Sequence, residues 1–82
     1  MNATITEKQT KITVITPSLK LKGLRTMCDI TGEKMAQFLN LSRNGYIKKE
    51  TGKNTFKEHE KEKILKLLQS HGIVITYDEL FL

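Results

Sequence analysis

Three side chains in residues 43–48 have the chemistry that is needed to read the edges of DNA bases. Arg43 can donate two hydrogen bonds to the acceptors of guanine, and Asn44 can pair with the donor and acceptor of adenine. Lys48 can contact guanine or a phosphate. We therefore expect this segment to be a DNA-reading helix.

Three further residues extend this candidate surface. Ile47 lies beside the polar readers, and an aliphatic side chain there could touch the methyl group of thymine. Lys53 and Asn54 follow the helix and suit contacts with the sugar-phosphate backbone, which position a protein on the duplex without reading its sequence. The sequence thus predicts a DNA-binding surface that extends from residue 43 to residue 54.

Two short helices joined by a tight turn would position these side chains. Thr31 and Ser42 can each cap a helix, because a hydroxyl oxygen accepts a hydrogen bond from an N–H group of the first turn. Between the two caps lies an apolar stripe at helical spacing, formed by Met35, Ala36 and Leu39. Asn40 tolerates the left-handed backbone that a tight turn requires. This stretch is typical of a helix-turn-helix.

At these residues the sequence resembles the lambda-repressor-like, or XRE/Cro, family of helix-turn-helix DNA-binding domains. The matching motifs are Leu21-Lys22-Gly23-Leu24-Arg25, Ile30-Thr31, Met35-Ala36, Leu41-Ser42 and Glu50-Thr51-Gly52. The resemblance implies a mainly α fold, with a small four-helix domain that places the helix after Ser42 in the major groove. It also implies that Arg25 and Glu50, 25 positions apart, form an ion pair between the first helix and the end of the reading helix.

Three residues depart from the family pattern. Gly32 stands where the family usually has a glutamine that contacts phosphate, and Lys49 stands where it prefers a buried aliphatic residue. Gly45 lies inside the reading helix, where glycine costs about 1 kcal/mol relative to alanine. These departures weaken the usual DNA surface of the family.

Composition and charge indicate one small basic domain. The 82 residues are 38% hydrophobic and carry a net charge of +5. Residues 1–30 and 31–54 each carry a net charge of +3, whereas residues 55–82 carry −1, so the basic charge accompanies the motif. Cys28 is the lone cysteine, and the first residues lack a secretory or membrane-spanning pattern. We expect a cytoplasmic protein without a membrane partner.

The domain is expected to have three parts. Residues 1–17 form an arm with a short strand at 12–16, residues 18–72 form the helix-turn-helix domain, and residues 73–82 form a tail with a strand at 73–77. Both strand predictions rest on runs of β-branched residues, and the first run ends at Pro17. These strands could pair within one chain or across a homodimer, or add to a neighbouring chain.

Capping residues and apolar stripes also predict the first and last helices of the domain. Ser18 can cap the first helix. The buried stripe of that helix would consist of Leu21, Leu24 and Cys28. The last helix would begin with a capping box from Thr55 to Glu58 and end at Gly72. Its core stripe would consist of Ile64, Leu67 and Leu68.

The leading hypothesis is a sequence-specific transcriptional regulator of the Cro or phage-repressor kind, which binds double-stranded DNA. The alternative is a protein-interaction module, such as an antirepressor that binds a larger repressor protein, or an antitoxin. Gly32, Gly45 and an exposed Ile47 would favour the alternative. We expect no enzyme, metal or cofactor, because the sequence has no nucleophile–base pair, paired carboxylates or ligand cluster. His59 and His71 lie twelve positions apart with no nearby ligand.

Overall fold

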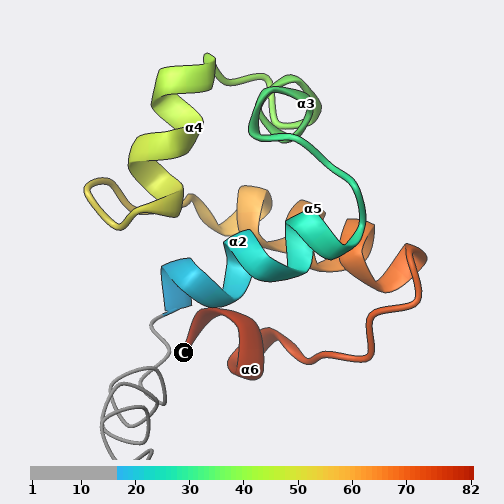
Figure 1. The fold of residues 1–82 in the computed structure, drawn as a ribbon. Helices are drawn as coiled ribbons and strands as arrows, with labels where there is room; N and C mark the ends of the chain where they lie inside the picture. The colour runs from blue at the N-terminus through green and yellow to red at the C-terminus, as the bar shows by residue number, and fades with distance from the viewer. Residues whose placement is uncertain (1–16) are drawn as a thin grey trace, which may run out of the picture.

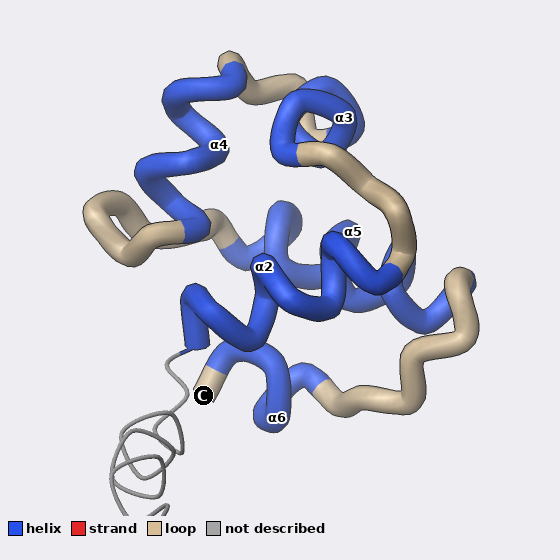
Figure 2. The backbone as a smooth tube through the Cα atoms, viewed as in Figure 1, coloured by secondary structure: helices blue, strands red, loops and turns tan. Residues whose placement is uncertain are grey.

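The fold is built from short helices. The computed structural model describes residues 17–82, and within them lie α2 (Pro17–Met27), α3 (Gly32–Phe38), α4 (Arg43–Glu50), α5 (Glu58–Ser70) and α6 (Tyr77–Phe81). Residues 17–82 contain no β-strand (Figure 2). The expected mainly α fold is confirmed, although this part of the chain holds five helices where the sequence predicted four.

The helices form two pairs connected by α2. In Figure 1, α3 and α4 lie together at the top of the view and α6 lies at the bottom, with α2 and α5 between them. The helix α2 packs against both α4 and α6, and the last residue lies beside the first turn of α2. The candidate site on α4 therefore packs mainly against α3, with further contacts to α2.

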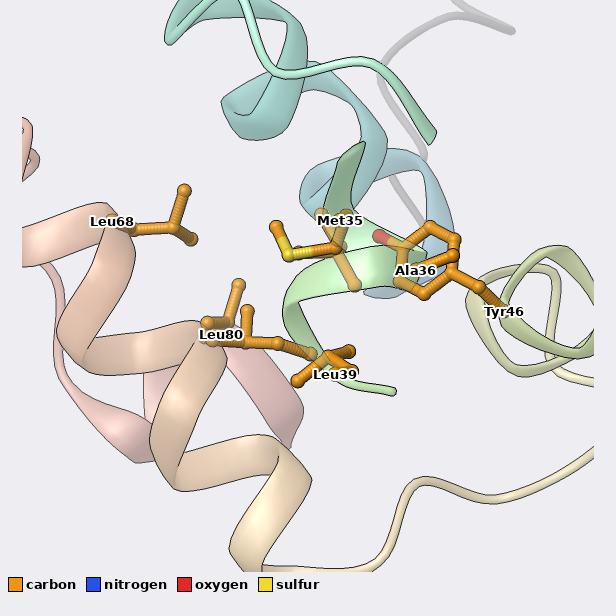
Figure 3. Packing of buried hydrophobic residues seen from close by; sticks show 8 residues of the cluster. Met35, Ala36, Leu39, Tyr46, Leu68 and Leu80 are labelled. Atoms are coloured by element: carbon orange, nitrogen blue, oxygen red, sulfur yellow. The ribbon is translucent and has the colours of Figure 1, made fainter. Parts of the chain in front are cut away.

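One apolar cluster lies at the centre of these helices. Its buried members are Leu21, Met35, Ala36, Leu39, Tyr46, Ile64, Leu68 and Leu80. Figure 3 shows Met35 in the middle of the cluster, with Leu68 to one side and Tyr46 to the other. The stripe predicted around Met35 is buried as expected, as are Ile64 and Leu68, whereas Leu67 and Cys28 are half-buried against the same cluster. Each of the five helices contributes at least one buried side chain.

The ends of four helices share one backbone motif. The residue after each C-cap has a positive φ, and these residues are Asp29 (59°), Asn40 (59°), Gly52 (91°) and Gly72 (89°). The N–H group of each bonds to the carbonyl three positions back, and the next N–H group bonds five positions back. This pair of bonds is the Schellman motif, which satisfies carbonyls that the helix leaves unpaired. The roles predicted for Asn40 and Gly72 are confirmed.

The starts of α3 and α4 agree with the sequence, whereas the starts of α2 and α5 do not. Thr31 Oγ1 accepts from Lys34 N–H at 3.1 Å, and Ser42 Oγ accepts from Gly45 N–H at 3.0 Å. The helix α2 begins at Pro17, one residue before the predicted cap Ser18, because proline suits the first position of a helix. Ser18 therefore lies inside the helix.

The helix α5 begins at Glu58, so the capping box predicted from Thr55 is wrong. Lys57 is the N-cap residue, and its N–H group donates to Glu60 Oε1 at 2.8 Å. A lysine side chain has no acceptor, so only the glutamate half of a capping box can form here. The carboxylate of Glu60 thus replaces the predicted threonine cap.

The strand predicted at residues 73–77 is also wrong. Residues 73–76 are irregular, and Thr76 is extended (φ −97°, ψ 166°) without a ladder partner. Ile73 and Ile75 are half-buried against the core while Val74 is 99% exposed, so the segment alternates as a strand would. Thr76 and Glu79 then form a capping box that starts α6. The strand predicted at residues 12–16 lies outside the described residues.

Four contacts hold α6 in place. Leu80 is 1% exposed in the core, and the Phe81 ring lies 6.3 Å from that of Phe56. Lys20 Nζ donates to the carbonyl oxygen of Glu79, which connects α6 to α2. Tyr77 Oη donates to Glu58 Oε2 at 2.7 Å, and this bond raises the pKa of Tyr77 to about 12. The helix is therefore bound to both α2 and α5.

Candidate functional site

The helix α4 carries the three predicted base readers. Arg43, Asn44 and Lys48 are exposed. Arg43 and Asn44 occupy the first turn, immediately after the Ser42 cap, and Lys48 lies about 7.5 Å further along the axis at 1.5 Å per residue. The three side chains could therefore reach along a stretch of groove shorter than one turn of DNA.

Ile47 does not belong to this exposed surface, contrary to the prediction. Its side chain is half-buried and packs against the core cluster. A Cβ atom at Gly32 would lie 3.3 Å from Ile47 Cδ1, so the glycine leaves room for this isoleucine. Gly32 thus serves the packing of α3 against α4, and Ile47 no longer favours a protein-binding surface.

The loop after α4 holds the two predicted backbone contacts. Lys53 and Asn54 are both exposed. Their N–H groups donate to one carbonyl oxygen, that of Lys48, at 2.8 and 3.1 Å. Because one carbonyl of α4 binds both residues, the loop is folded against the end of the helix. The structure therefore brings Lys53 and Asn54 to the same end of α4 as Lys48, whereas Arg43 and Asn44 lie at the other end.

The inner face of α4 is held by a buried network around Glu50. Arg25 Nε donates to Glu50 Oε2 at 2.9 Å, which confirms the predicted ion pair, and Arg25 Nη2 donates to Oε1 at 3.3 Å. Tyr46 Oη also donates to Glu50 Oε2, at 2.6 Å. The remaining guanidinium nitrogen, Nη1, donates to the carbonyl oxygen of Ile30 at 2.8 Å. The side chains of Arg25 and Glu50 thus connect α2, α4 and the segment that precedes α3.

The protonation states of this network are fixed by its own contacts. The hydrogen bond with Glu50 raises the pKa of Arg25 although burial acts in the opposite direction. Burial raises the pKa of Tyr46 far above its usual range, and the hydrogen bond to Glu50 adds to this effect. Tyr46 therefore stays a neutral donor, and Arg25 stays a cation, throughout the pH range in which the protein would act.

A second ion pair holds the inner side of α4 near its end. Lys49 stands where the resembling family prefers an aliphatic residue, and its Nζ lies 2.8 Å from Glu60 Oε1. The same oxygen accepts the N–H group of Lys57. Burial alone would raise the pKa of Glu60, but the hydrogen bonds from Lys49 and Lys57 outweigh burial and hold this pKa below its ordinary value of 4.5.

Replacing Glu60 with glutamine should lower the free energy of unfolding at pH 7 by about 1–3 kcal/mol, because Lys49 loses its partner in a largely buried place. A carboxylate with a depressed folded-state pKa stabilises above its unfolded pKa, and this contribution disappears as the pH falls through the folded-state value. The difference between the two proteins should therefore shrink below pH 4.5. Urea unfolding at several pH values measures this difference.

Glu62 provides the matched control for this experiment, because it lies on the same helix and is exposed. Glu62→Gln should change the free energy of unfolding by less than about 0.5 kcal/mol at every pH. A Glu60→Gln effect that stays constant from pH 7 to acid would contradict the role of the ionised carboxylate.

The roles of three residues in this region were not predicted from the sequence: Tyr46, Lys49 and Glu60. Tyr46 and Glu50 are four positions apart on one helix, which is the spacing for a side-chain contact, but that spacing alone does not reveal burial. Lys49 and Glu60 are eleven positions apart on different helices, so no local pattern connects them. The pairing of Lys49 with Glu60 becomes visible only when the positions of α4 and α5 are known.

Comparison of the chain with family models, with curated proteins and with solved structures found no significant match. The resemblance to the XRE/Cro family therefore rests on the residues quoted above. No helix in residues 17–82 combines the length and the apolar character that crossing a membrane requires. In the same residues no group of three His, Cys, Asp or Glu side chains could hold a metal ion.

Proposed function

We propose that this protein is a sequence-specific DNA-binding transcriptional regulator of the Cro or phage-repressor kind. In this proposal α3 and α4 form a helix-turn-helix, and α4 enters the major groove. Arg43 and Asn44 read base edges, Lys48 contacts guanine or phosphate, and Lys53 and Asn54 hold the DNA backbone.

The observation that supports this proposal is that α4 exposes the three predicted readers while a buried network anchors the helix. Arg43, Asn44 and Lys48 are exposed, whereas Tyr46 and Glu50 are buried; Glu50 accepts from Tyr46 and is paired with Arg25. These buried contacts hold α4 in one orientation, which base reading requires because hydrogen bonds to base edges are directional. An α-helix fits the major groove, which is about 12 Å wide.

The loop after α4 also supports the proposal. Lys53 is exposed and is attached through its N–H group to the carbonyl oxygen of Lys48. A backbone contact from this loop would therefore fix the angle at which α4 enters the groove. If the protein acts as a homodimer, two copies of α4 would lie about 34–36 Å apart, which is one helical turn of DNA.

A second candidate is a protein-interaction module, such as an antirepressor, a modulator of a larger repressor or an antitoxin. The large apolar side chains that remain exposed favour it, among them Met27 at 71% and Phe38 at 43%. They lie at the ends of α2 and α3 and are not needed for the proposed DNA surface. Copurification of a repressor protein together with an absence of selective DNA binding would favour this candidate.

The experiment begins with selection of preferred duplexes from random sequences, followed by titration on a selected and a random duplex at several salt concentrations. Arg43→Ala should weaken binding to the selected duplex by about 1–3 kcal/mol and weaken binding to random DNA much less. Lys53→Ala should weaken binding to both duplexes equally and lower the salt slope by about 0.9.

One control variant and one further variant of the proposed surface complete the experiment. Lys63 is an exposed lysine on α5, outside the proposed surface, so Lys63→Ala should leave affinity and selectivity nearly unchanged. Asn44→Ala should behave as Arg43→Ala does, because both are assigned to bases. If the wild-type protein prefers no selected duplex over random DNA, the proposal is wrong and the protein-binding candidate replaces it.

A further inference from the structure

An open cavity of about 300 Å³ lies between the end of α4, the loop that follows it, α2 and α6. Its apolar lining consists of Leu21, Phe56, Leu80 and Phe81. Two lysines, Lys49 and Lys61, stand among its polar lining residues. The cavity thus combines aromatic and aliphatic surface with ammonium groups, and its volume is at the small end of the range for ligand sites.

The charges around this cavity are neutralised, with one exception. Glu50, which also lines it, is paired with Arg25 at 2.9 Å, and Lys49 is paired with Glu60 at 2.8 Å. Lys61 has no carboxylate partner in the part of the chain that the structure describes. The lining therefore presents one uncompensated positive charge.

The surroundings of Lys61 keep its ammonium group at the cavity. Lys61 is half-buried, and its Nζ lies 5.9 Å from the centroid of the Tyr77 ring and 5.8 Å from that of Phe81. Glu58, one turn earlier on α5, accepts a hydrogen bond from Tyr77 Oη at 2.7 Å. Two ring faces thus hold the cation beside the apolar lining, where a carboxylate would gain a charge-assisted hydrogen bond.

We propose that this cavity binds a small apolar carboxylate, such as a short aromatic or branched aliphatic acid. The carboxylate pairs with Lys61, and the apolar body packs on Phe56, Leu80 and Phe81. The charge of the site selects a monoanion, because one lysine is unpaired and the other lining charges are already compensated. This proposal stands whether or not α4 binds DNA.

The test uses the full 82-residue protein and two probes of nearly equal size, phenylacetate and its uncharged amide, phenylacetamide. Phenylacetate should cause saturable shifts of the backbone amide signals of Phe56, Lys61 and Phe81 in NMR spectra. Phenylacetamide should bind at least about tenfold more weakly, which corresponds to the loss of about one charge-assisted hydrogen bond.

Two variants test whether Lys61 causes the preference for the acid over the amide. Lys61→Met keeps the length of the side chain and should remove the preference for the acid, so that both probes bind equally weakly. Lys63→Met changes an exposed lysine of the same helix outside the cavity and should leave the preference intact. The preference of the wild-type protein for the acid is informative even if the Lys61 variant folds poorly.

Several results would overturn the proposal. These are an absence of saturable shifts, equal binding of acid and amide by the wild-type protein, or unchanged binding of phenylacetate to Lys61→Met. None of these outcomes depends on DNA, so they leave the DNA-binding proposal to its own experiment.

Discussion

Glu50→Gln lowers the free energy of unfolding by about 3–5 kcal/mol, because the change leaves the buried guanidinium of Arg25 without its counter-charge. Tyr46 Oη also loses an ionised acceptor. For a domain of this size, each kcal/mol shifts the melting temperature by about 4–8 °C, so melting should occur at least roughly 12 °C lower. Thermal unfolding followed by circular dichroism measures this change.

Two comparisons separate the buried pair from general effects of charge. Glu33 is exposed on α3, so Glu33→Gln should change the free energy of unfolding by less than about 0.5 kcal/mol. Replacing Arg25 and Glu50 together with methionine and leucine should cost less than the sum of the single changes, since neither charge is then left alone. A melting temperature of Glu50→Gln equal to that of the wild type would contradict this account of the pair.

Leu80→Ala should lower the free energy of unfolding by about 2–5 kcal/mol, which is the usual cost of a large-to-small change in a core. Leu80 is 1% exposed and lies in the same cluster as Met35 and Leu68, so the change opens a space between α6 and the other helices. Chemical unfolding measured by fluorescence or circular dichroism gives the size of the effect.

Val74→Ala is the matched control, because Val74 lies six positions earlier and is 99% exposed. It should change the free energy of unfolding by no more than about 0.5 kcal/mol. If Leu80→Ala has an equally small effect, α6 does not belong to the cooperative unit of the fold.

Sequence predicted the helices best where their ends are determined locally. The Thr31 and Ser42 caps each require one hydroxyl and an N–H group three positions later, so adjacent residues contain the whole signal. Asn40 and Gly72 were found for the same reason. Asp29 takes the same left-handed conformation, although aspartate marks such a position less strongly than glycine or asparagine does.

The C-terminal segment was predicted wrongly because two signals compete there. A β-branched run favours extended backbone, and residues 73–76 are indeed not helical. A β-strand also requires a neighbouring strand to pair with, and the residue types of the run do not show whether one is present. The pattern Thr76-x-x-Glu79 is a helix-start signal and overlaps the end of that run. The capping box decides the structure, because its hydrogen bonds form within four residues.

In the candidate site, features that depend on neighbouring residues were predicted correctly, whereas a feature that depends on another helix was not. Arg43, Asn44 and Lys48 were chosen by their side-chain chemistry after the local Ser42 cap, and all three are exposed. The burial of Ile47 depends on the approach of Gly32 from α3, which the sequence of α4 does not contain. Its exposure was therefore predicted wrongly although its position in the helix was right.

The contact between α2 and α6 has a consequence for the order of folding. Lys20 and Glu79 are 59 positions apart, whereas α3 and α4 are joined by a short turn. The entropy lost on closing a loop grows with the logarithm of its length, so the contact of α2 with α6 costs more to form than the pairing of α3 with α4. We therefore expect the α3–α4 pair to be largely formed in the transition state, and α6 to dock afterwards. Changes in α6, such as Leu80→Ala, would then act mainly by speeding unfolding, and the lifetime of the folded protein would depend on the shortest helix of residues 17–82.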